Sequence, residues 1–261
     1  MITSEELYTN KIFLNSVLPL VKVIIESREN LSKKFKGKNG RVQISALDSD
    51  GKVGTHYIIK DGSFTVVKGI IENPNIELEF KSIPALNNFF AGKSKKLPKI
   101  KGWYHLGLLI STLSALMTMA KLLGAIKAPA KKEDKELLVK LLFYLLSSGI
   151  SQLNKTGHPK VSSWVKKSPD RVYAWTVNDK PELSAYIRVK AGKSKAARGV
   201  YRRSKPFFSM RFDNVDSALG ILLETDDMIE STASGKLMME GAPEYGAQLG
   251  EYMLLVGSFA K

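Results

Sequence analysis

The sequence predicts an α+β protein made of two similar halves, and three observations support this prediction. Strand-like stretches are gathered in the middle of each half and long apolar helices stand at the ends, an order typical of α+β rather than alternating α/β folds. Both halves repeat this order of elements. The chain has 261 residues, of which 44% are hydrophobic and 25% charged, so it can bury a large core without covalent cross-links.

The repeat is visible in an alignment of the two halves. Residues 41–69 align with residues 171–199 without a gap. The identities are Arg41/Arg171, Val42/Val172, Lys60/Lys190, Gly62/Gly192 and Gly69/Gly199. Two diverged copies of one unit, residues 1–128 and 129–261, explain this pattern, and chance similarity is the alternative.

Each copy is expected to begin with a long apolar helix. In the first copy this helix covers Ser4–Glu29, with a kink at Pro19. Thr3 and Glu6 have the spacing of a capping box that would open it. The second copy begins with a helix over Lys135–Lys155.

Alternating apolar and polar residues predict four strands in the middle of each copy. In the first copy they are Arg41–Leu47, Thr55–Lys60, Phe64–Lys68 and Ile76–Phe80, and in the second Arg171–Asn178, Leu183–Lys190, Ala196–Tyr201 and Phe207–Phe212. Asp61-Gly62 is a hairpin turn signal. Glu77 and Glu79 alternate with apolar residues, which predicts a sheet with one wet and one covered face.

Two helices are expected after the strands of each copy. A short helix covers Ile83–Phe90 in the first copy and Val215–Glu224 in the second, the latter capped by Asp213 or Asn214. A long apolar helix then ends each copy, and the second of these begins at Pro243.

The stretch Ser231–Gly257 resembles the end of the sterol-carrier-protein-2 family. Its matching features are a strand around Gly235-Lys236-Leu237, a turn at Glu240-Gly241 and a terminal amphipathic helix over Pro243–Gly257. In the first copy, Asp61-Gly62, Asn73-Pro74-Asn75-Ile76 and Ala91-Gly92-Lys93 follow the same family order, whereas Lys101-Gly102-Trp103 departs from it. The hairpin of the second copy is more basic than the family pattern.

The resemblance implies two tandem units, each a curved, mostly antiparallel five-stranded sheet covered by apolar helices. It also implies an apolar tunnel for an acyl chain, a sterol or a phospholipid chain. Family members serve alone as lipid carriers or as domains of larger enzymes. Non-enzymatic binding of a hydrophobic ligand is therefore the function that the sequence favours.

Apolar stripes at helical spacing supply candidates for the wall of such a pocket, although core packing is the ordinary role of any one of these residues. The candidates are Phe80, Phe89, Trp103, Leu106, Leu109, Leu113, Met117, Phe208, Met210, Leu222, Met238, Leu249 and Met253. Burial of a sixteen-carbon chain would contribute roughly 10–12 kcal/mol, less an association cost of at least ~4 kcal/mol.

A net charge of +15 favours an anionic partner. The candidates for contact with an anionic head group or a membrane are Arg188, Lys190, Lys193, Lys195, Arg198, Arg202 and Arg203. A solvated basic face is the alternative. Nucleic acid is disfavoured, because no zinc finger, basic zipper or aromatic RNA-binding strand is present. A protein with filled cores that uses this basic surface to bind an anionic partner is the second functional hypothesis.

Signatures of catalysis are weak. The absence of cysteine excludes disulfide frameworks, cysteine nucleophiles and thiolate metal sites. His56, His105 and His158 share no metal-ligand spacing, and Ser163-Trp164-Val165-Lys166 has a Ser-x-x-Lys spacing without its partner motifs. We therefore expect no enzyme activity, no metal and no cofactor.

Targeting signals are not evident in this sequence. The first residues are acidic where a secretory signal would be basic, and the uncharged run Leu106–Ala120 is shorter than the ~18–20 residues that cross a bilayer. A cytoplasmic monomer, with its two halves related by a pseudo-twofold axis, is the expectation.

Overall fold

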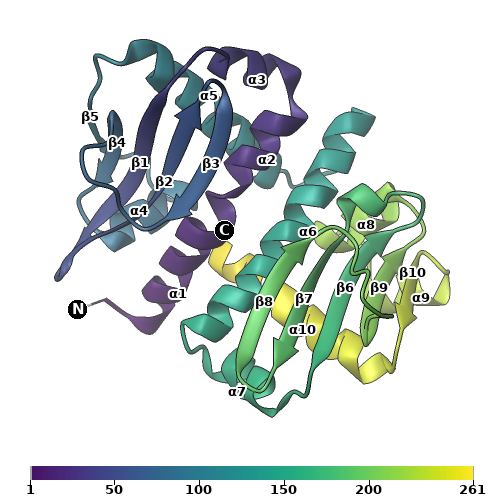
Figure 1. Ribbon diagram of the computed structural model, residues 1–261. Helices are drawn as coiled ribbons and strands as arrows, with labels where there is room; N and C mark the ends of the chain where they lie inside the picture. The colour runs from purple at the N-terminus through teal and green to yellow at the C-terminus, as the bar shows by residue number, and fades with distance from the viewer. Residues whose placement is uncertain (1, 261) are drawn as a thin grey trace. The chain divides into compact units, whose positions relative to one another are not determined.

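The computed structural model describes residues 2–260, which form two compact units, residues 2–121 with 259–260 and residues 122–258. Each unit contains one five-stranded sheet and its own helices (Figure 1). The predicted α+β class is therefore confirmed. The expected boundary at residues 128 and 129 falls in the segment between the helices Leu106–Leu123 and Lys132–Lys155.

The first unit begins with helices, continues with four strands and ends with a short helix, an edge strand and a long helix. Its elements are α1 (Ser4–Ile12), a π-helical turn (Phe13–Val17), α2 (Leu20–Ser27), α3 (Glu29–Phe35), β1 (Gly40–Asp48), β2 (Gly51–Lys60), β3 (Ser63–Lys68), β4 (Ile76–Phe80), α4 (Ile83–Phe90), β5 (Lys99–Lys101) and α5 (Leu106–Leu123).

The first predicted helix is divided rather than simply kinked. The capping box is confirmed, since Thr3 Oγ1 accepts from the Glu6 backbone N–H at 3.2 Å and Glu6 Oε2 accepts from that of Thr3 at 2.8 Å. The π-helical turn lies just before Pro19, which caps α2. The extended backbone of Arg28 then separates α3 as a helix of its own.

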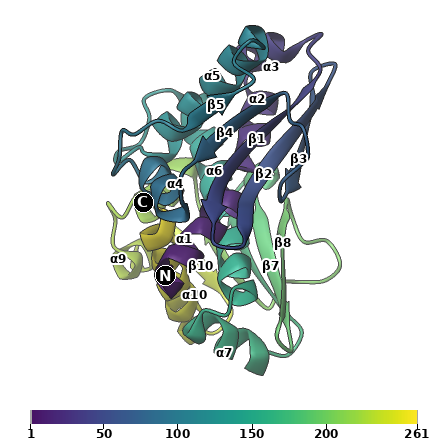
Figure 2. The ribbon, with the colours of Figure 1, turned by 90° about the vertical axis from the view of Figure 1, so that its left-hand side faces the viewer.

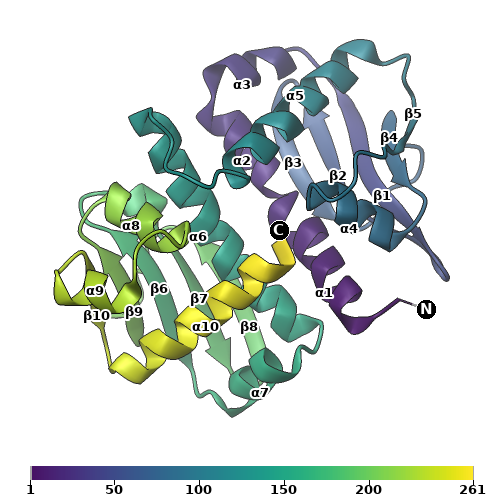
Figure 3. The same ribbon diagram turned by 180° about the vertical axis from the view of Figure 1, so that it is seen from behind.

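The first sheet has the strand order β3-β2-β1-β4-β5, with β4 parallel to β1 and the other pairs antiparallel. Helices cover one face of this sheet (Figures 1 and 3). On that face Tyr57 and Thr55 donate hydrogen bonds to the backbone carbonyls of Leu18 and Leu14. The hairpin at Asp61-Gly62 has positive φ at both residues, as its sequence predicted.

The second unit repeats this order of elements. Its elements are α6 (Lys132–Lys155), α7 (Pro159–Lys167), β6 (Arg171–Val177), a 3₁₀ turn (Pro181–Leu183), β7 (Ala185–Lys190), β8 (Lys193–Arg198), β9 (Phe208–Phe212), α8 (Val215–Leu222), α9 (Met228–Ala233), β10 (Leu237–Glu240) and α10 (Pro243–Ala260). Read from its other edge, the second sheet runs β8-β7-β6-β9-β10 and again contains one parallel pair, β6 with β9.

One strand of the second unit differs from its prediction. The sequence placed a strand at Ala196–Tyr201, but β8 covers Lys193–Arg198. Ala191 and Gly192 both have positive φ, so they close the hairpin and β8 follows directly. Gly199, also at positive φ, ends the strand.

Helix α7 was not predicted, although its position matters for the site described below. It begins at Pro159, which suits a first helical turn. Its buried residues are Val161 and Val165, four residues apart, so only a narrow apolar stripe faces the unit. That stripe is too short to distinguish a helix from a loop in the sequence.

Two helices among residues 2–260 are long and apolar enough to cross a membrane by length and composition, α5 and α6. The most apolar window of α6 is 78% buried, which is ordinary for the core helix of a soluble unit, whereas that of α5 is only 39% buried. The 18-residue α5 is longer than the uncharged run in the sequence suggested.

Gly102 lies between β5 and α5, and its replacement tests how closely the chain packs against Asn75 there. It has φ +74°, and a Cβ there would lie 1.8 Å from the backbone oxygen of Asn75. Gly102→Ala should therefore destabilise the protein by about 3 kcal/mol or more in urea unfolding, since backbone strain and a backbone clash add.

Gly92→Ala is the matched control, because Gly92 has φ +70° but open space around it. Its cost should be about 1–2 kcal/mol, from the backbone conformation alone. Equal losses in the two variants would show that the contact with Asn75 is not tight.

Candidate functional site

The proposed pocket-wall residues are dispersed in the structure rather than gathered around one cavity. Phe80, Leu109, Phe208, Met210, Leu249 and Met253 are buried. Phe89, Leu113, Leu222 and Met238 are half-buried, and Trp103, Leu106 and Met117 are exposed. None of them lines either cavity described below.

The buried members of this set pack tightly in the cores of their units. The indole N–H of Trp175 points to Met253 Sδ at 3.3 Å, and Phe80 lies against Phe89 with ring centroids 5.2 Å apart. A Cβ on Gly246 would lie 3.1 Å from the ring of Phe208. These residues fill space in the present conformation, as core residues do.

A cleft of about 660 Å³ in the second unit is lined by residues of α7, of α10 and of the first position of β6. Figure 3 shows the two helices and the strand. This volume is within the range of small-molecule sites. Its lining residues are Lys160, Ser163, Trp164, Lys167, Ser168, Arg171, Tyr245, Gln248, Glu251 and Tyr252. We call it the α7–α10 cleft.

Aromatic rings form the apolar part of the α7–α10 cleft. Trp164 packs against Tyr252 and against Tyr173, with ring centroids 4.9 and 5.2 Å apart. Tyr245 lies edge-on to Phe207 at 4.8 Å. Aromatic walls offer a large apolar contact area at little conformational cost.

Cationic groups also line the cleft. The Arg171 guanidinium lies 3.9 Å from the ring centroid of Phe207 and 5.1 Å from that of Tyr245, so aromatic rings position it. Lys160 and Lys167 add two more cations. Glu251 is the acidic lining residue, and Lys160 Nζ pairs with it at 2.5 Å.

Two buried hydroxyls at this site have no hydrogen-bond partner among the described residues, Ser168 Oγ and Tyr173 Oη. Ser168 is 5% exposed and lines the cleft, and Tyr173 is 1% exposed behind Trp164. Burial raises the pKa of Tyr173, with Arg171 opposing the rise, and burial raises the pKa of Tyr252 to about 12. Both phenols are therefore neutral at pH 7. An unpaired buried hydroxyl is costly, and a polar ligand group in the cleft would satisfy the Ser168 hydroxyl.

The corresponding place in the first unit is closed. Gly40 begins β1 as Arg171 begins β6, and Leu108 is the third residue of α5 as Tyr245 is of α10. A Cβ on Gly40 would lie 2.6 Å from Leu108 Cδ2, so α5 rests directly on the strand. Lys38 Nζ also ties the two sides together by donating to Gly107 O and Ser111 Oγ, both at 2.6 Å.

A second cavity of the second unit, about 740 Å³, is lined by charges of both signs. Its charges are largely paired: Lys135 with Asp216 at 2.6 Å, Lys180 with Glu136 at 3.0 Å and, more loosely, Lys236 with Asp226 at 3.9 Å. Such a wall suits neither an acyl chain nor a strongly anionic group.

The predicted head-group residues lie on the β7–β8 hairpin and the loop after it, not at the α7–α10 cleft. By register, Arg188, Lys190, Lys193 and Lys195 share one face of the hairpin. Asp170 pairs with Arg188 at 2.5 Å and with Lys190 at 3.4 Å. Arg198 is a cation–π partner of Tyr144 at 4.9 Å, and Arg202 and Arg203 are exposed in the loop. Lys160, Lys167 and Arg171, which do line the cleft, were not in the predicted set.

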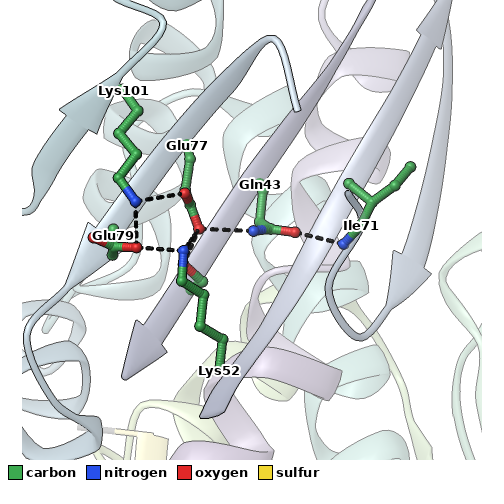
Figure 4. Close-up of polar contacts among 7 residues, drawn as sticks. Gln43, Lys52, Ile71, Glu77, Glu79 and Lys101 are labelled. Atoms are coloured by element: carbon green, nitrogen blue, oxygen red, sulfur yellow. Dashed lines mark hydrogen bonds and ion pairs between the residues drawn. The ribbon is translucent and has the colours of Figure 1, made fainter. Parts of the chain in front are cut away.

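A polar network occupies the centre of the open face of the first sheet (Figure 4). Glu77 Oε1 accepts from Gln43, Ser45 and Lys52 at 2.8, 2.7 and 2.8 Å. The prediction that Glu77 is on a wet face is wrong, since this residue is only 4% exposed. His56 on the same face is 5% exposed and contacts Gly69 O at 2.8 Å.

Two lysines complete this network and fix its charge state. Lys101 Nζ lies 3.2 Å from Glu77 and 2.5 Å from Glu79, and Lys52 also pairs with both carboxylates. Burial alone would raise the pKa of Glu77, but the hydrogen bonds from Lys52, Ser45 and Gln43 outweigh it and lower the pKa to about 2. Glu77 is therefore ionised at neutral pH, unlike a general acid or base poised near pH 7.

Within residues 2–260, no cluster of three or more His, Asp or Glu residues has the geometry of a metal site.

Comparisons with known proteins give a likeness among solved structures only. No family model and no curated protein matches the chain. The solution structure of the conserved hypothetical protein TT1886 of Thermus thermophilus, for which a sterol carrier protein is suggested, matches at 13% identity and TM-score 0.31, over 44% of this chain and 85% of that one.

Two further structures match at similar levels. The ubiquinone synthesis protein UbiJ-SCP2 matches at 14% identity and TM-score 0.29, over 45% of this chain and 96% of that one. The stereoselective inverting sec-alkylsulfatase Pisa1 from Pseudomonas sp. matches at 12% identity and TM-score 0.25, over 55% of this chain and 29% of that enzyme.

The Glu77 network predicts a specific loss of stability in acid. The folded-state pKa lies below the ordinary value, so the network contributes fully above pH 4.5 and this contribution is lost as the pH falls from 4.5 towards 2. Urea unfolding at a series of pH values measures it. Glu77→Gln should lower stability by about 2 kcal/mol at pH 7 and make the acid-induced decline shallower.

Glu244→Gln, which changes an exposed carboxylate in the first turn of α10, serves as the control. It should leave the pH profile unchanged. If Glu77→Gln retained the wild-type slope between pH 4.5 and 2, the carboxylate would not be held as described.

Proposed function

We propose that this protein binds an amphipathic, anionic hydrophobic ligand, such as a fatty acid or an acyl chain with an acidic head group, without chemical conversion. The observation that carries the proposal is the α7–α10 cleft, where aromatic rings meet Arg171 and Lys167 beside the Ser168 hydroxyl, which has no hydrogen-bond partner among the described residues. Seven of the ten lining residues are polar or charged and three are aromatic, which suits a ligand with an anionic head group and an apolar part.

The head group of the ligand would lie near Arg171 and Lys167. Arg171 is held against two aromatic rings, so little rotamer freedom is lost when it binds a carboxylate or phosphate. Ser168 Oγ would donate to the same anion. The acyl chain would lie against Trp164, Tyr245 and Tyr252, because these rings supply the apolar surface of the cleft.

The absence of catalysis is part of the proposal. Burial raises the pKa of Tyr173 and Tyr252, so both stay protonated at pH 7 and cannot accept a proton, and the described residues place no histidine in the lining of the cleft. The carboxylates of the Glu77 network belong to the other unit and are already fully hydrogen-bonded. Binding and release are the chemistry that the site supports.

We further propose that the two units are diverged copies of one ancestral unit and that only the second retains an open site. Their sheets have the same strand order and the same single parallel pair. The first unit has Gly40 and Leu108 in contact where the second has Arg171 and Tyr245. One ligand per chain is the expected stoichiometry.

Charge reversal in the cleft tests this function. Lys167→Glu should weaken binding of a fluorescent fatty acid by about tenfold or more, because it places a carboxylate beside the bound anion. Binding of the corresponding methyl ester, which has no charge, should change by less than about threefold. Fluorescence titration of the purified protein measures both.

Lys166→Glu is the matched control, since Lys166 is the neighbouring exposed residue of α7 and does not line the cleft. It makes the same change in net charge. If the two variants bound the fatty acid equally, or if the wild type showed no saturable binding, the proposed site would be wrong. The second outcome would favour a protein with filled cores that uses its basic surface for an anionic partner.

A further inference from the structure

Helix α5 carries an apolar stripe on its exposed side, whereas its buried side combines Ser111 and Thr112 with apolar residues such as Leu109 and Met119. Ser111 and Thr112 are 2% and 1% exposed, whereas Leu106, Ile110 and Met117 are 56%, 62% and 72% exposed. The three exposed residues lie four and seven positions apart and therefore form one stripe. Of the α5 residues expected to line a pocket, Leu106 and Met117 thus face solvent, whereas Leu109 is buried and Leu113 half-buried.

Hydrogen bonds fix this orientation of the helix. Lys34 Nζ donates to Ser114 Oγ at 2.8 Å, and Ser111 Oγ donates to the backbone oxygen of Lys34 at 3.1 Å. Lys38 donates to Ser111 as well. α5 lies alongside α3 through these bonds (Figure 2), and rotation of α5 to bury its apolar stripe would break them.

Aromatic residues extend the apolar stripe at the N-terminal end of α5. Trp103 and Tyr104 are 66% and 70% exposed, and Leu97, in the loop before β5, is 79% exposed. Trp and Tyr are the side chains enriched at the boundary between lipid and water. We call Trp103, Tyr104, Leu106, Ile110 and Met117 the α5 face.

The charge of this region is uniformly positive. The sequence contains no Asp or Glu between Glu79 and Glu133. Its lysines there include Lys93, Lys95 and Lys96 in the loop before β5, Lys99 on β5 and Lys121 on α5. Each lysine close to an anionic leaflet strengthens binding by about fivefold.

We propose that the α5 face docks on an anionic lipid bilayer, with α5 lying in the plane of the interface and its lysines on the head groups. Apolar and aromatic residues beside lysines, with no carboxylate between them, are the composition of an interfacial membrane helix. The side of α5 that carries Ser111 and Thr112 is buried against its own unit and held there by Lys38, so α5 would lie on the membrane rather than across it. This surface belongs to the first unit, and the proposal does not depend on the α7–α10 cleft.

Co-sedimentation with vesicles tests the proposal. The full-length protein should bind phosphatidylcholine vesicles that contain about one third phosphatidylserine, and bind pure phosphatidylcholine vesicles at least about tenfold more weakly. Ile110→Glu/Met117→Glu should weaken binding to the mixed vesicles by about tenfold or more. Ile229→Glu, at an 80% exposed apolar residue of α9, should leave it unchanged.

Tryptophan emission gives a second measurement at the α5 face. Of the three tryptophans, Trp103 is exposed and Trp175 fully buried. Mixed vesicles should shift the emission to shorter wavelength, and Trp103→Phe should abolish this shift. The proposal would be overturned if the Ile110→Glu/Met117→Glu variant bound the mixed vesicles as tightly as the wild type does. It would also be overturned if the wild type bound neutral and mixed vesicles equally. It would also fail if that variant instead abolished a concentration-dependent dimer seen by light scattering, because a second copy would then cover the face.

Discussion

In each sheet the fourth strand along the chain pairs in parallel with the first, and the rest of the sheet depends on this pairing. This pairing places Glu77 beside Gln43 in one unit and Ser209 beside Ala174 in the other, at the same step of the ladder. It also obliges the chain to cross the open face of the sheet between the third and fourth strands. In the first unit that crossing segment bonds to the sheet through Ile71 N–H and Gln43 Oε1 at 2.6 Å. This segment thereby covers the centre of the open face. Because the Glu77 carboxylate is buried there, it requires the positive charges of Lys52 and Lys101 beside it.

Local features of the fold could be predicted from the sequence, and long-range ones could not. The capping box at Thr3, the turn at Asp61-Gly62 and the strand Ile76–Phe80 follow from short-range chemistry and match the structure. The burial of Glu77 depends on Lys52 and Lys101, which come from other strands. No local pattern signals such a network, because an alternating carboxylate on a strand usually faces water.

Most of the candidate site could not be predicted from the sequence, for a similar reason. Leucines and methionines at helical spacing indicate which helices are apolar, but not which side of a helix its neighbours cover. In α5, the covered side is the one whose Ser111 and Ser114 accept hydrogen bonds from Lys38 and Lys34, and Leu106, Ile110 and Met117 are left exposed. The cleft in the second unit arises because Arg171 and Tyr245 stand where the first unit has Gly40 and Leu108. A few residues at the start of the central strand and of the last helix thus distinguish the closed side of the first unit from the open cleft of the second.

Native mass spectrometry of the purified protein, compared with its denatured mass, tests the central claim most directly. The account predicts one lipid-sized mass per chain that is lost on denaturation, and its loss or marked reduction in Lys167→Glu but not in Lys166→Glu. A protein of bare mass that also fails to take up added fatty acid would contradict the account, as would two ligands per chain retained equally by both variants.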